Sequence, residues 1–134
     1  MFYPTTSLVT LISLLVYFWM ATQVARTRRN VGIPAPAMAG DERLERTIRA
    51  HVNTLEWMPI FLPALWLFAV YWGDGPPAVL GAVWAIGRVI YFLGYVRSTA
   101  GRRPGFLIQV AAVTVLVLGS PGRVVWLLVN GSGL

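Results

Sequence analysis

Four long apolar segments, at 2–25, 57–72, 77–96 and 104–120, constrain the fold of this chain more than any other feature. A helix needs roughly 20 predominantly apolar residues to cross the hydrocarbon core of a bilayer. Four such spans and their connections use nearly the whole chain, and only 12% of its residues are charged. The sequence therefore predicts an all-α integral membrane protein, a four-helix bundle that forms one transmembrane domain over 1–134.

Glycine, proline and acidic residues indicate where the helices begin and end. The segment 30–40 combines glycine with two prolines, which favours a connecting loop. Asp41 can then cap a long second helix over 42–72. Pro121-Gly122 is predicted to break the fourth helix and to leave 123–130 as a short tail. The uncharged start of the chain favours a retained span over a cleaved signal peptide.

All 11 basic residues are arginine, and the formal net charge is +6. In a membrane protein the position of this charge decides its meaning, so we expect no nucleic-acid partner. Six arginines lie in 26–49, three lie in 97–103, and none lies between the second and third spans. The positive-inside rule therefore predicts that both arginine-rich connections are cytoplasmic. The bias toward arginine fits either a high-GC genome or a working anion site.

The chain has no cysteine and a single histidine. This excludes disulfides, thiolate metal sites and an internal thiol nucleophile, and we predict no metal site. Any sulfur chemistry at this protein would need a thiol supplied from outside the chain.

A polar stripe runs along the second helix toward the membrane. Arg49, Asn53 and Glu56 are spaced four and three residues apart, which places them on one helical face over two turns. His51 points toward a different neighbour. Ionised side chains at membrane depth are costly, so they usually line a cavity or pair with a partner.

The third helix carries a matching stripe of Arg88, Tyr91 and Tyr95. Arg102 follows Arg88 by fourteen residues, which places it near the same face if the helix continues that far. Both stripes then face the same membrane boundary.

One carboxylate, Glu56, faces a surplus of arginines. Glu56 can neutralise Arg49 or Arg88 and simply hold the bundle together. It cannot also satisfy Arg102 and Arg28, so the surplus indicates an anionic ligand that carries a cationic group for Glu56. Glutathione, with two carboxylates, an amino group and a thiol, fits this description, and an arginine beside its sulfur would favour the thiolate. Composition alone supports a lipid phosphate equally well.

Two stretches of sequence resemble a known family. They are 45–62, ERTIRAHVNTLEWMPIFL, and 87–95, GRVIYFLGY. Both are similar to the membrane-associated proteins in eicosanoid and glutathione metabolism (MAPEG), in particular to their glutathione-conjugating branch, and the likeness runs through all four spans. The resemblance implies a homotrimer with glutathione bound between neighbouring subunits on the cytoplasmic side. We expect a bacterial inner-membrane protein.

The resemblance also implies roles for individual residues. Arg102 resembles the family's thiolate-stabilising arginine, with adjacent Arg103 as the alternative, and Arg28 resembles an arginine that reaches the neighbouring subunit's site. The other implied glutathione-binding residues are Arg49, His51, Asn53, Glu56, Trp57, Arg88, Tyr91 and Tyr95. Two of them depart from the family pattern, since His51 stands where the synthases have glutamine and Trp57 replaces a tyrosine.

The function implied by the resemblance is that of a detoxifying enzyme. It would be a glutathione-dependent transferase or peroxidase acting on hydrophobic electrophiles or lipid hydroperoxides that enter from the membrane. A non-catalytic lipid-binding member of the family is the main alternative. A small four-helix drug exporter is less consistent with the sequence, because such a protein needs a membrane-embedded carboxylate in its first span, and 2–25 has no charge.

Overall fold

A computed structural model describes residues 2–131, and in that range it contains helices and no strand. The elements are α1 (Pro4–Val31), α2 (Glu42–Trp72), α3 (Gly75–Arg97), the short 3-10 helix η1 (Ala100–Arg102) and α4 (Arg103–Asn130). Each of the four long helices has the length and apolar composition needed to cross a membrane. For these residues the prediction of an all-helical fold with four helices able to span a membrane is therefore confirmed.

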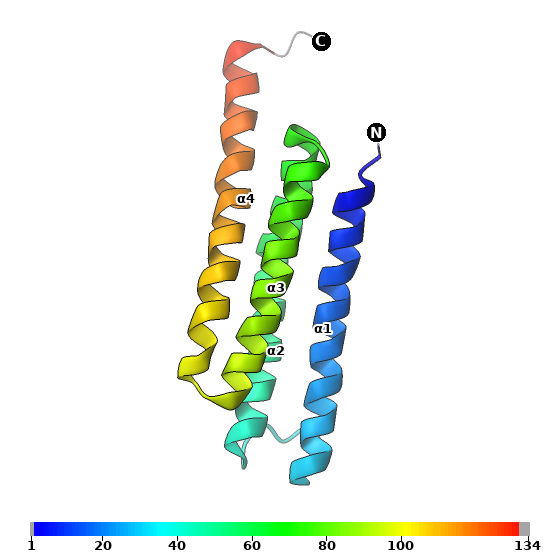
Figure 1. The fold of residues 1–134 in the computed structure, drawn as a ribbon, viewed down its shortest axis with the longest axis vertical. Coiled ribbons are helices and arrows are strands. Elements are labelled where there is room, and N and C mark those ends of the chain that lie inside the picture. Colours follow the sequence, from blue (N-terminus) through cyan, green and yellow to red (C-terminus); the bar gives the residue numbers. More distant parts are fainter. Residues whose placement is uncertain (1, 132–134) are drawn as a thin grey trace.

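Successive long helices run in opposite directions, so the two arginine-rich connections lie at one end of the bundle and the α2–α3 turn lies at the other (Figure 1). The first helix extends past its apolar run to Val31 and ends at Gly32, whose φ of 72° is readily adopted by glycine. Asp41 caps α2 as predicted, and its side chain accepts a hydrogen bond from the backbone N–H of Leu44 at 2.9 Å.

The prediction that Pro121-Gly122 breaks the fourth helix is wrong, because α4 continues to Asn130. Proline removes one backbone donor, which ends many helices that water can hydrate. In an apolar span the nearby carbonyls need protein donors instead. Ser120 Oγ donates to the carbonyl of Leu116 at 3.0 Å, and Trp72 Nε1 of α2 donates to that of Gly119 at 3.1 Å. The carbonyl that Pro121 leaves without its helical donor is that of Val117, so these two bonds stabilise the adjoining turns and do not replace the lost bond.

Helices α3 and α4 pack backbone against backbone through glycines. A Cβ added at Gly105 would overlap the backbone of Tyr91 and lie 2.6 Å from the carbonyl oxygen of Gly87. One added at Gly94 would overlap the carbonyl of Gly101. Small residues allow this close approach between membrane helices. The contact holds η1 and the start of α4 against the last turns of α3.

The core lies between α2, α3 and α4, where the rings of Phe61 and Trp84 stack with their centroids 3.8 Å apart and both side chains are fully buried. Large apolar side chains also cover the outside of the bundle, and Leu107 and Leu118 are each 68% exposed. An apolar exterior of this kind is suited to contact with lipid.

Candidate functional site

Arg88 lies at the centre of the site, fully buried between α2 and α3. Its Nε and Nη2 donate to Thr54 Oγ1 at 3.2 and 2.6 Å, and Nη2 also donates to Asn53 Oδ1 at 3.1 Å. Its Cζ lies 4.2 Å from the ring centroid of Tyr91. Within residues 2–131 no carboxylate pairs with Arg88, and its Nη1 has no partner. Neutral oxygens and one ring face therefore hold this charge.

Asn53 connects the buried arginine to an ion pair at the surface. Its Nδ2 donates to Glu56 Oε2 at 3.3 Å, and Arg49 donates to the two oxygens of Glu56 at 3.0 and 3.4 Å. The Arg49 and Glu56 side chains are 53% and 48% exposed, and pairs this exposed contribute at most about 1 kcal/mol. The pairing considered from the sequence thus exists for Arg49 and not for Arg88. An anion and an ammonium group could replace it at little cost.

The third-helix stripe continues through Tyr91 and Tyr95, whose ring centroids lie 5.7 Å apart. Arg102 follows, with its Cζ 5.3 Å from the centroid of Tyr95. The helix does not continue to Arg102 as the register argument required, because α3 ends at Arg97. Arg102 reaches the stripe because η1 folds back along the glycine contact between α3 and α4.

Two clefts lie beside these stripes. The first has a volume of about 340 Å³ and is lined by Asn53, Tyr91, Arg102, Arg103 and Phe106. The second has a volume of about 450 Å³ and is lined by Glu42, Glu45, Arg46, Arg49, Tyr95 and Thr99. Both offer guanidinium donors together with neutral polar groups, which suits an anionic ligand. We use the name arginine cleft for the first of them, and both Arg102 and Arg103 line it.

Two of the expected ligand residues occupy other positions. Trp57 packs edge-on against Phe106, with ring centroids 6.1 Å apart, and so supports the wall of the arginine cleft. His51 stacks on Tyr17 of α1 at 4.6 Å, and its Nε2 is buried without a partner in the described chain. As the spacing predicted, His51 lies off the Arg49 stripe, and it lines neither cleft.

Arg28 is also separate from the stripes of its own chain. Its Nη1 donates to the carbonyl of Ala37 and, at 3.5 Å, to that of Ile33. It lines a shallow hollow with Arg29, Gly32 and Pro34 and lines neither cleft. Within one chain the structure therefore brings together Arg49, Asn53, Glu56, Arg88, Tyr91, Tyr95 and Arg102, without Arg28.

Two buried polar residues of this region, Thr54 and Gln109, were not predicted from the sequence. Thr54 is fully buried and accepts two hydrogen bonds from the guanidinium. Gln109 of α4 is fully buried, neither of its amide atoms has a partner in the described chain, and its backbone packs on Gly87. Gln109 is the one amide side chain in the apolar run 104–120, which is a usable signal. Thr54 gave no such signal, because helical threonine ordinarily bonds its own helix.

Most of the chain is similar in sequence to known proteins. The model of the MAPEG family matches residues 6–120. An uncharacterized protein of Synechocystis is 38% identical over 120 residues, which cover 90% of this chain and 88% of that protein. Leukotriene C4 synthase of Cavia porcellus is 35% identical, with coverages of 90% and 72%. Microsomal glutathione S-transferase 2 of Homo sapiens is 32% identical, with coverages of 82% and 75%.

Proposed function

Because the chain belongs to the MAPEG family, as its two motifs predicted, we propose that it is a membrane-embedded, glutathione-dependent transferase or peroxidase. Two relatives are named for the synthesis of leukotriene C4 and for glutathione S-transfer. The observation that carries the proposal is the buried Arg88, which has no carboxylate partner within residues 2–131 and is linked through Asn53 to the exchangeable Arg49–Glu56 pair. A charge held in this way is suited to an anionic ligand.

The donor set fits glutathione group by group. Its two carboxylates require cationic donors, which Arg49 and Nη1 of Arg88 would supply, the latter having no partner within residues 2–131. Its amino group requires an anion, and Glu56 is the carboxylate of the stripe. Tyr91 and Tyr95 add hydroxyl groups beside these charges. We propose that these residues bind glutathione as the co-substrate. The resemblance assigns His51 and Trp57 to the same binding set, although within one chain they pack on Tyr17 and Phe106.

Arg102 is the proposed catalytic residue. A guanidinium beside the thiol favours the deprotonated sulfur, which is the nucleophile. In transfer, this sulfur bonds to an electrophilic carbon of the acceptor while the bond from that carbon to its leaving group breaks, so that a chlorinated nitrobenzene releases chloride and the thiol proton goes to solvent. In the peroxidase reaction two glutathione thiols are oxidised to a disulfide, while the hydroperoxide is reduced to an alcohol and water. Arg103 remains the alternative, since both arginines line the arginine cleft.

The proposed acceptors are hydrophobic electrophiles or lipid hydroperoxides, because the exterior of the bundle is apolar and such molecules concentrate in the membrane. We place the working site in a homotrimer of a bacterial inner membrane, with both arginine-rich connections in the cytoplasm. The positive-inside rule supports that orientation, and the relative in Synechocystis supports a bacterial membrane.

The central experiment measures glutathione binding and turnover with purified protein in detergent. Calorimetry should detect glutathione binding, and a chlorinated nitrobenzene or a lipid hydroperoxide should be turned over. Absence of binding at millimolar glutathione would defeat the proposal. Binding without turnover of either acceptor would favour the non-catalytic lipid-binding alternative.

The matched pair Arg102→Ala and Arg103→Ala tests the catalytic assignment. Arg102→Ala should abolish the ultraviolet absorbance of bound thiolate while much of the glutathione binding remains, and Arg103→Ala should keep that absorbance. The opposite pattern would move the role to Arg103.

A further inference from the structure

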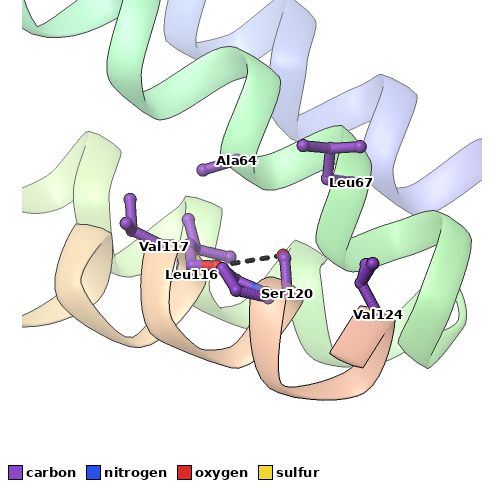
Figure 2. Close-up of a pocket in the computed structure, with 7 residues that line it drawn as sticks. Ala64, Leu67, Leu116, Val117, Ser120 and Val124 are labelled. Carbon is purple, nitrogen blue, oxygen red and sulfur yellow. Dashed lines mark hydrogen bonds between the residues drawn. The ribbon is translucent and has the colours of Figure 1, made fainter. Parts of the chain in front are cut away.

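A groove between α2 and α4 lies away from the arginine cleft, toward the end of the bundle that carries the α2–α3 turn. It has a volume of about 400 Å³ and is lined by Ala64, Leu67, Leu116, Val117, Ser120, Pro121 and Val124. Figure 2 shows these side chains on the two helices that border the groove. The hydroxyl of Ser120 donates to the carbonyl of Leu116 at 3.0 Å, so the one polar side chain of the wall is already engaged. The groove is therefore suited to a hydrocarbon.

One cation, the guanidinium of Arg123, lies beside this groove. Arg123 directly precedes Val124, which is part of the wall. The Cζ of Arg123 is 4.5 Å from the ring centroid of Trp126 and 5.7 Å from that of Trp72. Trp72 is itself fixed to α4 by its hydrogen bond to Gly119. Within residues 2–131 Arg123 forms no ion pair, and every other arginine belongs to the opposite half of the bundle. Arg123 is thus a positioned cation to which residues 2–131 supply no anion.

The length of the groove matches one leaflet. Leu116 and Val124 are eight residues apart on α4, a distance of about 12 Å along the helix. Half of a bilayer's hydrocarbon core is about 15 Å thick. Indole rings favour the boundary between hydrocarbon and headgroups, and Trp72 and Trp126 therefore place Arg123 at that depth.

We propose that this groove binds one phospholipid, with an acyl chain between α2 and α4 and the phosphate against Arg123. The guanidinium can donate two parallel hydrogen bonds to phosphate oxygens. A second copy of this chain is a poorer occupant, because its residues 2–131 would cover Arg123 without supplying a free carboxylate. The acidic residue at this end is Asp74, and its oxygens already accept the backbone N–H groups of Thr5 and Thr6.

The ligand side of the proposal is tested with two lipids that share the same acyl chains. Delipidated protein in detergent is titrated with phosphatidylglycerol or with diacylglycerol, and bound lipid is counted by native mass spectrometry. Phosphatidylglycerol should bind roughly tenfold more tightly, the difference expected from losing a charge-assisted hydrogen bond. Arg123→Gln should reduce phosphatidylglycerol binding to the diacylglycerol level, and Arg123→Lys should keep most of it.

The groove itself is tested by filling it. Val117→Trp, in the wall, should block lipid binding, whereas Leu118→Trp adds the same bulk at a position that is 68% exposed and outside the wall. Equal lipid binding by Arg123→Gln and the unchanged protein would overturn the proposal. So would a Val117→Trp protein that keeps its lipid but loses its oligomeric state, since the groove would then be a subunit contact. Glutathione binding should survive in all these variants, which separates this test from that of the proposed function.

Discussion

At the scale of single residues, the main physical question is how the bundle tolerates the charge of Arg88. A buried cation without a carboxylate requires that every available neutral acceptor point at it. Thr54 Oγ1 is the main acceptor, because it accepts hydrogen bonds from both Nε and Nη2 of Arg88. Its own hydroxyl proton is directed to the carbonyl of Ala50 at 3.0 Å. Thr54 therefore fixes the orientation of the guanidinium that is proposed to bind glutathione.

The variant Thr54→Val removes this acceptor while keeping the shape of the side chain. We expect a loss of about 1–3 kcal/mol in stability, the cost of leaving a buried charged donor unsatisfied, together with weaker glutathione binding. Unfolding in sodium dodecyl sulfate and calorimetry measure the two effects. Thr47→Val is the control, because Thr47 is equally buried but donates only to the carbonyl of Arg43 in its own helix. An equal cost for both variants would contradict the role given to Thr54.

At the scale of helices, the contact between α3 and α4 determines where the stripe ends. Gly105→Ala places a methyl group against the backbone of Tyr91, where no side chain can move aside. We expect a loss of about 1–3 kcal/mol from overpacking, and a larger fall in glutathione affinity because Tyr91 and Arg102 separate. Gly122→Ala in the same helix meets no atom within 4 Å and should be neutral or stabilising by up to about 1 kcal/mol. Similar losses in both variants would show that α4 tolerates no alanine, independent of the contact.

The other end of the bundle carries a cap formed between elements. Asp74, in the α2–α3 turn, accepts the backbone N–H groups of Thr5 and Thr6 at 2.9 and 2.8 Å, at the start of α1. A carboxylate in this position satisfies orphan donors and interacts favourably with the helix dipole. Desolvation raises the pKa of the Asp74 carboxyl, but hydrogen bonds from Thr5 and Thr6 outweigh it and lower the pKa from 3.8 to about 2.

The direction of the pH dependence follows from that lowered pKa. The carboxylate stabilises the folded protein fully above about pH 4, and this contribution is lost as the pH falls through about 2. The stability difference between the unchanged protein and Asp74→Asn should therefore be constant at neutral pH and shrink between these values. Comparing unfolding midpoints of the two proteins over this range cancels the titration of all other carboxyl groups. A difference that stays constant down to pH 2 would contradict the assignment.

These elements also show what sequence could and could not predict. The stripe of Arg49, Asn53 and Glu56 followed from the helical period alone, because all three residues lie on one helix. The position of Arg102 could not be predicted in this way, because it depends on a backbone contact between α3 and α4 that no local sequence pattern encodes. The continuation of α4 past Pro121 could not be predicted from the local sequence either, because one of the bonds near Pro121 comes from Trp72 of another helix.

At the scale of the whole molecule, a single chain does not explain how Arg28 could bind glutathione. It donates to carbonyls of the α1–α2 connection and lines neither of the two clefts beside the stripes. The family resemblance assigns such an arginine to the site of a neighbouring subunit. The proposed homotrimer would therefore build each site from Arg102 of one subunit and Arg28 of the next, and a closed symmetric ring repeats that arrangement three times.

Mixed oligomers test this arrangement directly. Arg28→Ala and Arg102→Ala should each lack activity as pure oligomers. Coexpressed and purified through both tags, they should recover about a third of the normal activity, because each trimer that contains both variants has one neighbour pair of its three that joins an intact Arg28 to an intact Arg102. If both arginines serve the site of their own chain, no mixture contains a complete site and activity stays absent. Turnover of a chlorinated nitrobenzene by the copurified mixture, with each subunit carrying a different tag, distinguishes the two arrangements.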